Sequence, residues 1–185
     1  ETIKNAPAVI FDMRGYPRGD TARIYTHLTD KSLAPAVFSR PYRDAKDLNI
    51  SYHEEGANYS LMVRNEPAKR FQGEIYKGKI IVLINENTQS AAEGATGSFA
   101  NVRPDTVFIG TPTAGANGDV TYMVLPGNIK VAFTGHNVRR YDGQQLQRVG
   151  IQPKIFIAPT IRGILEGRDE ILDAAHNFLQ SNAAK

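Results

Sequence analysis

The chain has 185 residues, of which 41% are hydrophobic and 22% charged, with 16 glycines and 10 prolines. This ordinary globular composition excludes a collagen, a coiled coil and a disordered tail. The lack of cysteine excludes a thiolate nucleophile, a disulfide framework and a cysteine-ligated zinc site. The net charge of +3 comes without a basic run longer than Arg139-Arg140, so no nucleic-acid partner is predicted.

A chain of this length can bury a substantial core, and we expect a single domain over residues 1–185. No stretch approaches 18 consecutive apolar residues, so no membrane span is expected. The sequence starts at Glu1 with neither an initiator methionine nor a signal-type apolar region. We therefore interpret it as a fragment of a longer chain whose upstream portion is absent.

Three short apolar runs predict buried, parallel strands, at residues 8–11, 79–84 and 106–110. Residues 90–101 lie between the second and third runs, and their small side chains suit a tightly packed helix. Strand, helix and strand at this spacing predict a βαβ unit.

The segments around these strands are less regular. Residues 21–28 carry apolar side chains at helical spacing after Asp20, which predicts a helix with Asp20 as its N-cap. Residues 35–77 are polar and interrupted by proline and glycine, so we expect irregular or peripheral structure there.

Two elements are expected near the end of the chain. Residues 120–125 and 129–133 flank Pro126-Gly127-Asn128, which predicts a β-hairpin. Residues 169–179 place their apolar side chains on one helical face, which predicts a terminal helix.

Ser90 stands where a buried strand gives way to a polar loop and then a helix. That junction exposes a hydroxyl beside the unpaired N–H groups and positive dipole end of a helix, which favour negative charge developing on an acyl substrate. The spacing to Glu93 is also that of a capping box, with Ser90 as N-cap. Spacing alone leaves a nucleophile and a structural cap open.

Residues 12–20 follow the first strand and include Gly15 and Gly19, where the backbone can approach a ligand closely. Their N–H groups could form half of an oxyanion hole, or the segment could be a plain strand-to-helix connection. The glycine-rich stretch 110–119 lacks the Gly-Lys-Ser/Thr ending of a phosphate loop and precedes a strand. Nucleotide binding is therefore not predicted.

Four blocks carry a family resemblance, and they come in matching order and spacing. The sequence resembles the C-terminal processing peptidases and tricorn-core serine peptidases, of the tail-specific protease type, over nearly all of residues 8–180. The blocks are FDMRGYPRG at 11–19, VLINENTQSAAE at 82–93, IGTPTAG at 109–115 and QRVGIQPKI at 147–155.

The resemblance implies a ClpP/crotonase-like α/β fold, with stacked ββα units, a mixed sheet and a late β-hairpin. It implies hydrolysis of peptide bonds with Ser90 as nucleophile, without a cofactor or metal ion, on a peptide or protein substrate. The oxyanion donors it implies are the backbone amides of Ala91 and Gly19, with Arg18 as a shift by one residue.

The general base departs from the family pattern. The processing peptidases carry a lysine directly after the third block and a glutamine four residues on, but this chain has Ala116 and Val120 there. The tricorn-like branch uses a histidine from a strand before the first block, and a glutamate near the position of Gln147. Serine needs a base at neutral pH. We therefore expect the base to come from outside the fragment, which leaves the isolated fragment inactive.

The four histidines are His27, His53, His136 and His176. Three are interpreted as surface or structural residues, while His136 in the hairpin region is a weak candidate for the site. A serine-type endopeptidase of the periplasm, cell envelope or extracellular space is the favoured function. The alternatives are a non-catalytic ligand- or peptide-binding module on the same fold and a crotonase-type acyl-CoA enzyme.

Overall fold

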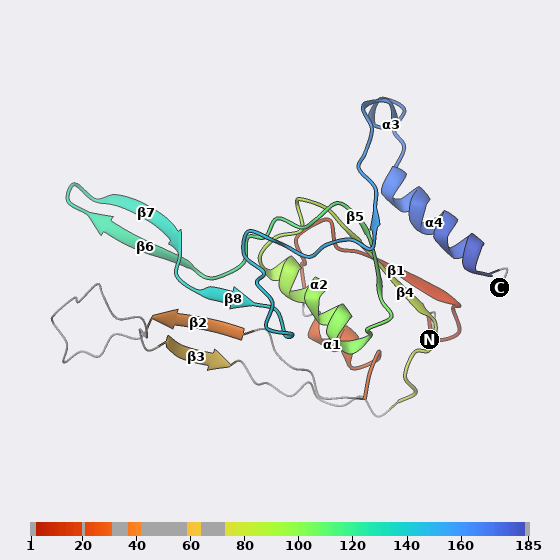
Figure 1. Cartoon of the computed structure of the whole chain (residues 1–185), viewed down its shortest axis with the longest axis horizontal. Helices are drawn as coiled ribbons and strands as arrows, with labels where there is room; N and C mark the ends of the chain where they lie inside the picture. The colour runs from red at the N-terminus through yellow and green to blue at the C-terminus, as the bar shows by residue number, and fades with distance from the viewer. Residues whose placement is uncertain (1–2, 20, 31–36, 42–58, 64–72, 184–185) are drawn as a thin grey trace.

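The computed structural model describes residues 3–19, 21–30, 37–41, 59–63 and 73–183. Its main sheet contains four parallel strands in the order β1-β4-β5-β9 (Figure 1). These strands are β1 (Ala8–Asp12), β4 (Lys79–Ile84), β5 (Val107–Gly110) and β9 (Ile155–Phe156). The three predicted strands are confirmed, and the helix between the second and third is α2 (Ala91–Val102).

Strand β4 is the centre of the core and is apolar on both faces, as expected of a strand covered on both sides. Ile80, Val82 and Ile84 pack on one side against α1 (Ala22–Tyr25) and α2. Ile81 and Leu83 pack on the other side against α4 (Glu170–Ala183). The sheet is therefore a middle layer, with α2 and α4 on opposite sides of it (Figure 1).

An aromatic cluster fixes α2 against the sheet. The ring of Phe99 on α2 lies 4.6 Å from that of Phe11 on β1, and 5.2 Å from that of Tyr25 in an edge-to-face contact. The Tyr25 hydroxyl donates a hydrogen bond of 2.8 Å to the carbonyl oxygen of Ala95. These contacts hold the helix whose first turn follows Ser90.

The expected helix over residues 21–28 is shorter than predicted. The backbone N–H groups of Ile24, His27 and Leu28 donate to carbonyls three residues back rather than four, so only α1 itself is helical. Tyr25 and Leu28 are nevertheless buried, as their spacing predicted. Asp20, the predicted N-cap, lies outside the described residues.

The prediction of irregular or peripheral structure over residues 35–77 is corrected at two regular strands, which lie outside the main sheet. β2 (Val37–Pro41) pairs antiparallel with β3 (Tyr59–Val63) and with β8 (Asn137–Arg139), which makes a separate three-stranded sheet. The partner β8 comes about 100 residues later, and no local pattern signals such a pairing.

The predicted hairpin is confirmed as β6 (Val120–Leu125) and β7 (Ile129–Thr134), which project away from the sheet layers (Figure 1). Every residue of both strands is exposed. Its eight large apolar side chains are between 38% and 63% exposed. The short helix α3 (Ile161–Leu165), which the sequence did not predict, projects from another part of the molecule before α4.

The carboxyl end of β5 depends on Gly110, which has φ +134° and lies directly against the carbonyl oxygen of Ile84 on β4. A Cβ there would clash with backbone in addition to straining it. We expect Gly110→Ala to lower the free energy of unfolding by at least about 2 kcal/mol, measured by urea denaturation.

Gly143→Ala is the matched control, because Gly143 also has a positive φ, of 78°, but has no neighbour within 4 Å of an added Cβ. The free energy of unfolding of this variant should fall only by the cost of backbone strain, about 1 kcal/mol. Equal losses in the two variants would contradict the close approach between β5 and β4.

Candidate active site

Three loops meet at the carboxyl ends of β1, β4 and β5, and buried Thr88 joins them. Its hydroxyl donates to the carbonyl oxygen of Met13, after β1, at 2.8 Å, and accepts from the N–H of Asn85 at 3.2 Å. Its own carbonyl accepts from the N–H of Ala114, after β5, at 3.0 Å. Two residues beyond Thr88 the chain reaches Ser90, so the loop that carries this serine is tied to both neighbours.

Ser90 has a backbone conformation that side-chain-bearing residues rarely adopt, with φ 54° and ψ −119°. The N–H of Ala92 donates to the carbonyl oxygen of Gln89 at 3.0 Å. The angles and this bond define a type II′ turn with Ser90 at the position that favours glycine. Ser90 is the N-cap of α2, and the predicted capping box with Glu93 is present. An ordinary N-cap nevertheless lies in the extended region, whereas a strained serine between a strand and a helix is a feature of nucleophile turns.

The carboxylate of Glu93 holds the Ser90 turn against the loop after β5. Glu93 is only 1% exposed. Its two oxygens accept from the Thr113 hydroxyl at 2.6 Å and from the N–H groups of Gly115, Ala116 and Ser90 at 2.7, 3.0 and 3.3 Å. The predicted contact with Ser90 is thus present, but three of the four hydrogen bonds go to a loop that the spacing did not indicate.

Ala116 contacts Ser90 directly through the backbone. Its carbonyl oxygen accepts a 2.8 Å hydrogen bond from the Ser90 N–H. The position at which the processing peptidases carry lysine is therefore adjacent to the serine, and here it bears only a methyl group. Val120, the second departure, is exposed at the start of β6.

The two predicted oxyanion donors lie on exposed backbone. Ala91 is the first residue of α2, and within the described ranges its N–H group has no hydrogen-bond partner. Gly19 is exposed, with open space where a Cβ would stand, and Arg18 beside it is exposed too. The hydrogen bond from Thr88 to Met13 links their two loops. Their role as donors stays a prediction.

The histidines are spread over the molecule. The His136 side chain is largely buried at the base of the hairpin, where Nδ1 accepts from the Asp119 N–H at 3.4 Å. Gln147 donates to the carbonyl oxygens of Asn117 and His136, at 2.7 and 2.8 Å. These two hydrogen bonds connect the start of the hairpin to the loop after Ala116. Two other histidines, His27 and His176, are exposed. His53 lies outside the described residues.

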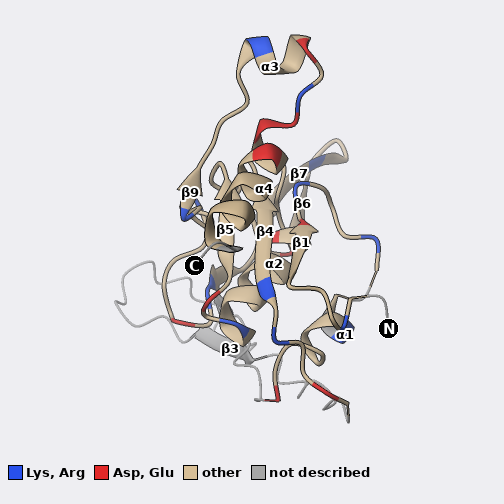
Figure 2. Cartoon of the chain, turned by 90° about the vertical axis from the view of Figure 1, so that its right-hand side faces the viewer, with Lys and Arg blue, Asp and Glu red and all other residues tan. Residues whose placement is uncertain are grey.

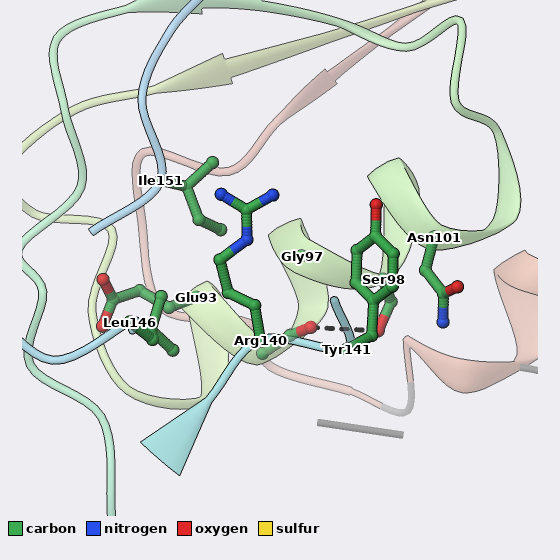
Figure 3. Close-up of a pocket in the computed structure, with 9 residues that line it drawn as sticks. Glu93, Gly97, Ser98, Asn101, Arg140, Tyr141, Leu146 and Ile151 are labelled. Carbon is green, nitrogen blue, oxygen red and sulfur yellow. Dashed lines mark hydrogen bonds between the residues drawn. The ribbon is translucent and has the colours of Figure 1, made fainter. Parts of the chain in front are cut away.

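A pocket runs along α2 beside the site, with about 330 Å³ of empty space, part of it open to solvent. Arg140 and Tyr141 line it together with Ser98 and Asn101 of α2 (Figure 3). It shares Glu93 with the Ser90 turn. This pocket was not predicted from the sequence, although Gly94 and Gly97, three residues apart on the helix, indicate a face without bulky side chains.

Arg14 fixes the turn after β1. Its guanidinium donates to Asp12 through Nε at 2.9 Å and Nη2 at 2.6 Å, and to Asp169 through Nη1 and Nη2, both at 2.7 Å. Hydrogen bonds from Arg14 hold the pKa of both carboxyl groups below its usual value. No sequence pattern indicated the contact between Arg14 and Asp169, which lie 155 residues apart.

Over the ranges that the structure describes, no three His, Asp or Glu side chains are grouped to hold a metal ion. None of the described helices is both long and apolar enough to cross a membrane.

A sequence model of peptidase family S41 matches residues 1–157, which is most of the chain. The chain belongs to peptidase family S41. This confirms the family resemblance. No curated protein matches it in sequence.

Solved structures share the fold. Mature CPAF complexed with lactacystin has a TM-score of 0.73 at 18% identity, over 96% of this chain and 45% of that one. A candidate peptidase from Parabacteroides merdae ATCC 43184 has a TM-score of 0.66 at 24% identity, over 95% of this chain and 53% of that one. The photosystem II D1 C-terminal processing protease has a TM-score of 0.55 at 16% identity, over 86% of this chain and 37% of that one. This S41 chain thus spans between 37% and 53% of the length of these solved structures.

These likenesses confirm the predicted ClpP/crotonase-like α/β fold. Among the described strands, the main sheet is parallel throughout, and the antiparallel pairs form two separate sheets.

The arginine between Asp12 and Asp169 predicts acid sensitivity of the S41 domain. A carboxyl whose pKa is lower in the folded state stabilises the fold fully above its unfolded pKa, about 3.9, and that stabilisation is lost as the pH falls through the folded value. We expect the urea concentration at the unfolding midpoint to decrease as the pH is lowered below about 4. The Arg14→Gln variant should have a lower free energy of unfolding at pH 7 than the unsubstituted protein. Its free energy of unfolding should also decrease less between pH 5 and pH 3.

The control is Arg18→Gln, an exposed arginine on the same turn. Its stability should follow the unsubstituted protein at each pH. An Arg14→Gln profile parallel to that of the unsubstituted protein would contradict the assignment of the acid-sensitive carboxyls.

Proposed function

We propose that Ser90 is the nucleophile with which this domain hydrolyses peptide bonds, and that the N–H groups of Ala91 and Gly19 are the oxyanion donors. Ser90 Oγ would attack the carbonyl carbon of the scissile bond while its proton passes to a general base. The carbonyl oxygen becomes an oxyanion that accepts hydrogen bonds from the two amides, and the amine leaves with a proton from the base.

The observation that carries this proposal is the strained turn at Ser90. A sparsely populated backbone conformation costs about 1–3 kcal/mol and persists where the surroundings over-determine it, most often at functional sites. Here the surroundings are the bonds from the Ser90 N–H to Ala116 and Glu93. Glycine would fit this turn without strain, so a serine here is explained by its hydroxyl.

The base is proposed to come from outside residues 1–185. Ala116 is next to Ser90 but has nothing to titrate, and the His136 ring is engaged with Asp119 at the base of the hairpin. General-base assistance contributes about 10²–10⁴ in rate. We therefore expect no turnover above background from residues 1–185 alone.

The substrate of the whole protein is proposed to be a peptide or protein, as family membership implies. A periplasmic, cell-envelope or extracellular location is part of the same proposal. It is supported by a structural neighbour described as a lipoprotein from Streptococcus agalactiae, at 18% identity and a TM-score of 0.57.

Strain at a nucleophile predicts that activity and stability oppose each other at Ser90. We expect Ser90→Gly to abolish hydrolysis and to raise the free energy of unfolding by about 1 kcal/mol, because glycine adopts the turn freely. Ser90→Ala should also be inactive but no more stable, since alanine keeps a Cβ. Urea denaturation of both variants measures this difference, and equal stability would contradict the strain.

A serine-directed phosphonate tests the nucleophile itself. On the intact protein we expect covalent labelling, located at residue 90 by peptide mass spectrometry. Ser90→Ala should remove it, while Ser98→Ala, which changes a serine beside the neighbouring pocket, should not. Labelling that survives Ser90→Ala would overturn the assignment. An intact protein that is neither labelled nor active would favour the ligand- or peptide-binding module.

A further inference from the structure

Two distant parts of the chain meet at Arg14. Asp169, 155 residues later, receives two guanidinium N–H groups and also accepts from the N–H of Leu172, which caps the first turn of α4. Figure 2 shows acidic residues gathered where the chain returns from α3 into α4. The ion pair therefore joins the start of α4 to the turn after β1.

Arg14 lies in the chain between two segments of the candidate site, so its ion pair with Asp169 can influence both. On one side is Met13, whose carbonyl oxygen accepts the hydroxyl of Thr88, two residues before Ser90. On the other side is the segment 15–19, which ends at Gly19. No atom comes within 4 Å of an added Cβ at Gly15 or Gly19. Arg14 is thus the last firmly held residue before an open turn.

The geometry leaves Arg14 little freedom. Nε, Nη1 and Nη2 all donate to the two carboxylates, and the Arg14 N–H donates to Asp12 Oδ1 at 3.1 Å. Bidentate guanidinium–carboxylate contacts fix orientation as well as distance. With the side chain and its own N–H held, the direction in which the backbone leaves Arg14 toward Gly15 is set.

We propose that Asp169 is a positioning residue which, through Arg14, holds the turn of residues 15–19 so that its backbone amide faces Ser90. This inference rests on the proposed function, because it assigns the turn to the oxyanion hole. Asp169 touches no reacting atom. Its effect on rate comes from placing a donor that acts only in the transition state.

A comparable ion pair elsewhere in the fold provides a matched control. Arg103 donates to Asp105 through Nε at 2.8 Å and Nη2 at 2.7 Å, and also to the carbonyl oxygens of Tyr76 and Gly78, both at 3.1 Å. Gly78 immediately precedes β4, at the end of the sheet opposite Ser90. Loss of this pair should cost stability without reaching the site.

The test compares Asp169→Asn with Asp105→Asn in the intact protein. Asparagine still caps a helix, so Asp169→Asn removes the charge while keeping the start of α4. We expect kcat to fall about 10- to 100-fold with KM within two-fold of the unsubstituted enzyme, as for a donor that acts only in the transition state. Asp105→Asn should leave kcat unchanged, and Asp169→Glu should restore part of it.

Amide hydrogen exchange gives a readout that is independent of activity. The N–H groups of Met13 and Arg14, which donate to Leu83 at 3.0 Å and to Asp12 at 3.1 Å, should exchange several-fold faster in Asp169→Asn than in Asp105→Asn. Equal exchange, or equal kcat in the two variants, would overturn the positioning role. A protein that shows no Ser90-dependent turnover would instead refute the proposed function, and the exchange rates would still decide whether Asp169 holds the turn.

Discussion

The site depends on one buried carboxylate. Glu93 is shielded from water, and a carboxylate in that position would cost several kcal/mol if it were left unpaired. Four hydrogen bonds from Ser90 and from the loop at 113–116 satisfy it, at the first turn of α2, where the helix dipole also favours negative charge. Because α2 is itself anchored by Phe99, the core determines where this carboxylate lies and hence how the Ser90 turn is held.

Around this carboxylate the molecule separates two tasks. The turn at Ser90 is fixed by contacts within the domain, through Ala116, Glu93 and Thr88. Position 116, whose carbonyl oxygen accepts from the Ser90 N–H, carries only a methyl group and cannot remove the serine's proton. Under the proposed function, the domain would supply a shaped nucleophile and a helix N-terminus, and the acid–base group would come from another part of the protein. These two halves can be perturbed separately.

Features of the structure that depend on residues close in sequence were predicted, and features that depend on residues distant in the chain were not. The strands at 8–11 and 79–84 were predicted because burial on both faces leaves a continuous apolar run. The contact from Ser90 to Glu93 was predicted because it spans one helical turn. The bonds from Glu93 to the loop after β5, the pairing of β2 with β8 and the ion pair from Arg14 to Asp169 join residues distant in the chain. No local periodicity records them, and a serine in a type II′ turn contradicts the residue preferences on which a prediction would rely.

The hairpin of β6 and β7 has a consequence for how the molecule opens. Its register places Met123, Leu125, Ile129, Val131 and Phe133 on one face and Val120, Tyr122, Val124 and Lys130 on the other, and no residue of either strand is buried. A two-stranded ribbon without a covering layer is at best marginally stable in water. Cooperative protection from solvent comes from buried contacts, which β4 has in full and this ribbon lacks. Compared with the main sheet, the ribbon is therefore expected to fray first, at a free energy far below that of global unfolding. Its base, where the N–H of Gly135 donates to the carbonyl oxygen of Asp119, is where such fraying should stop before it reaches the loop beside Ser90.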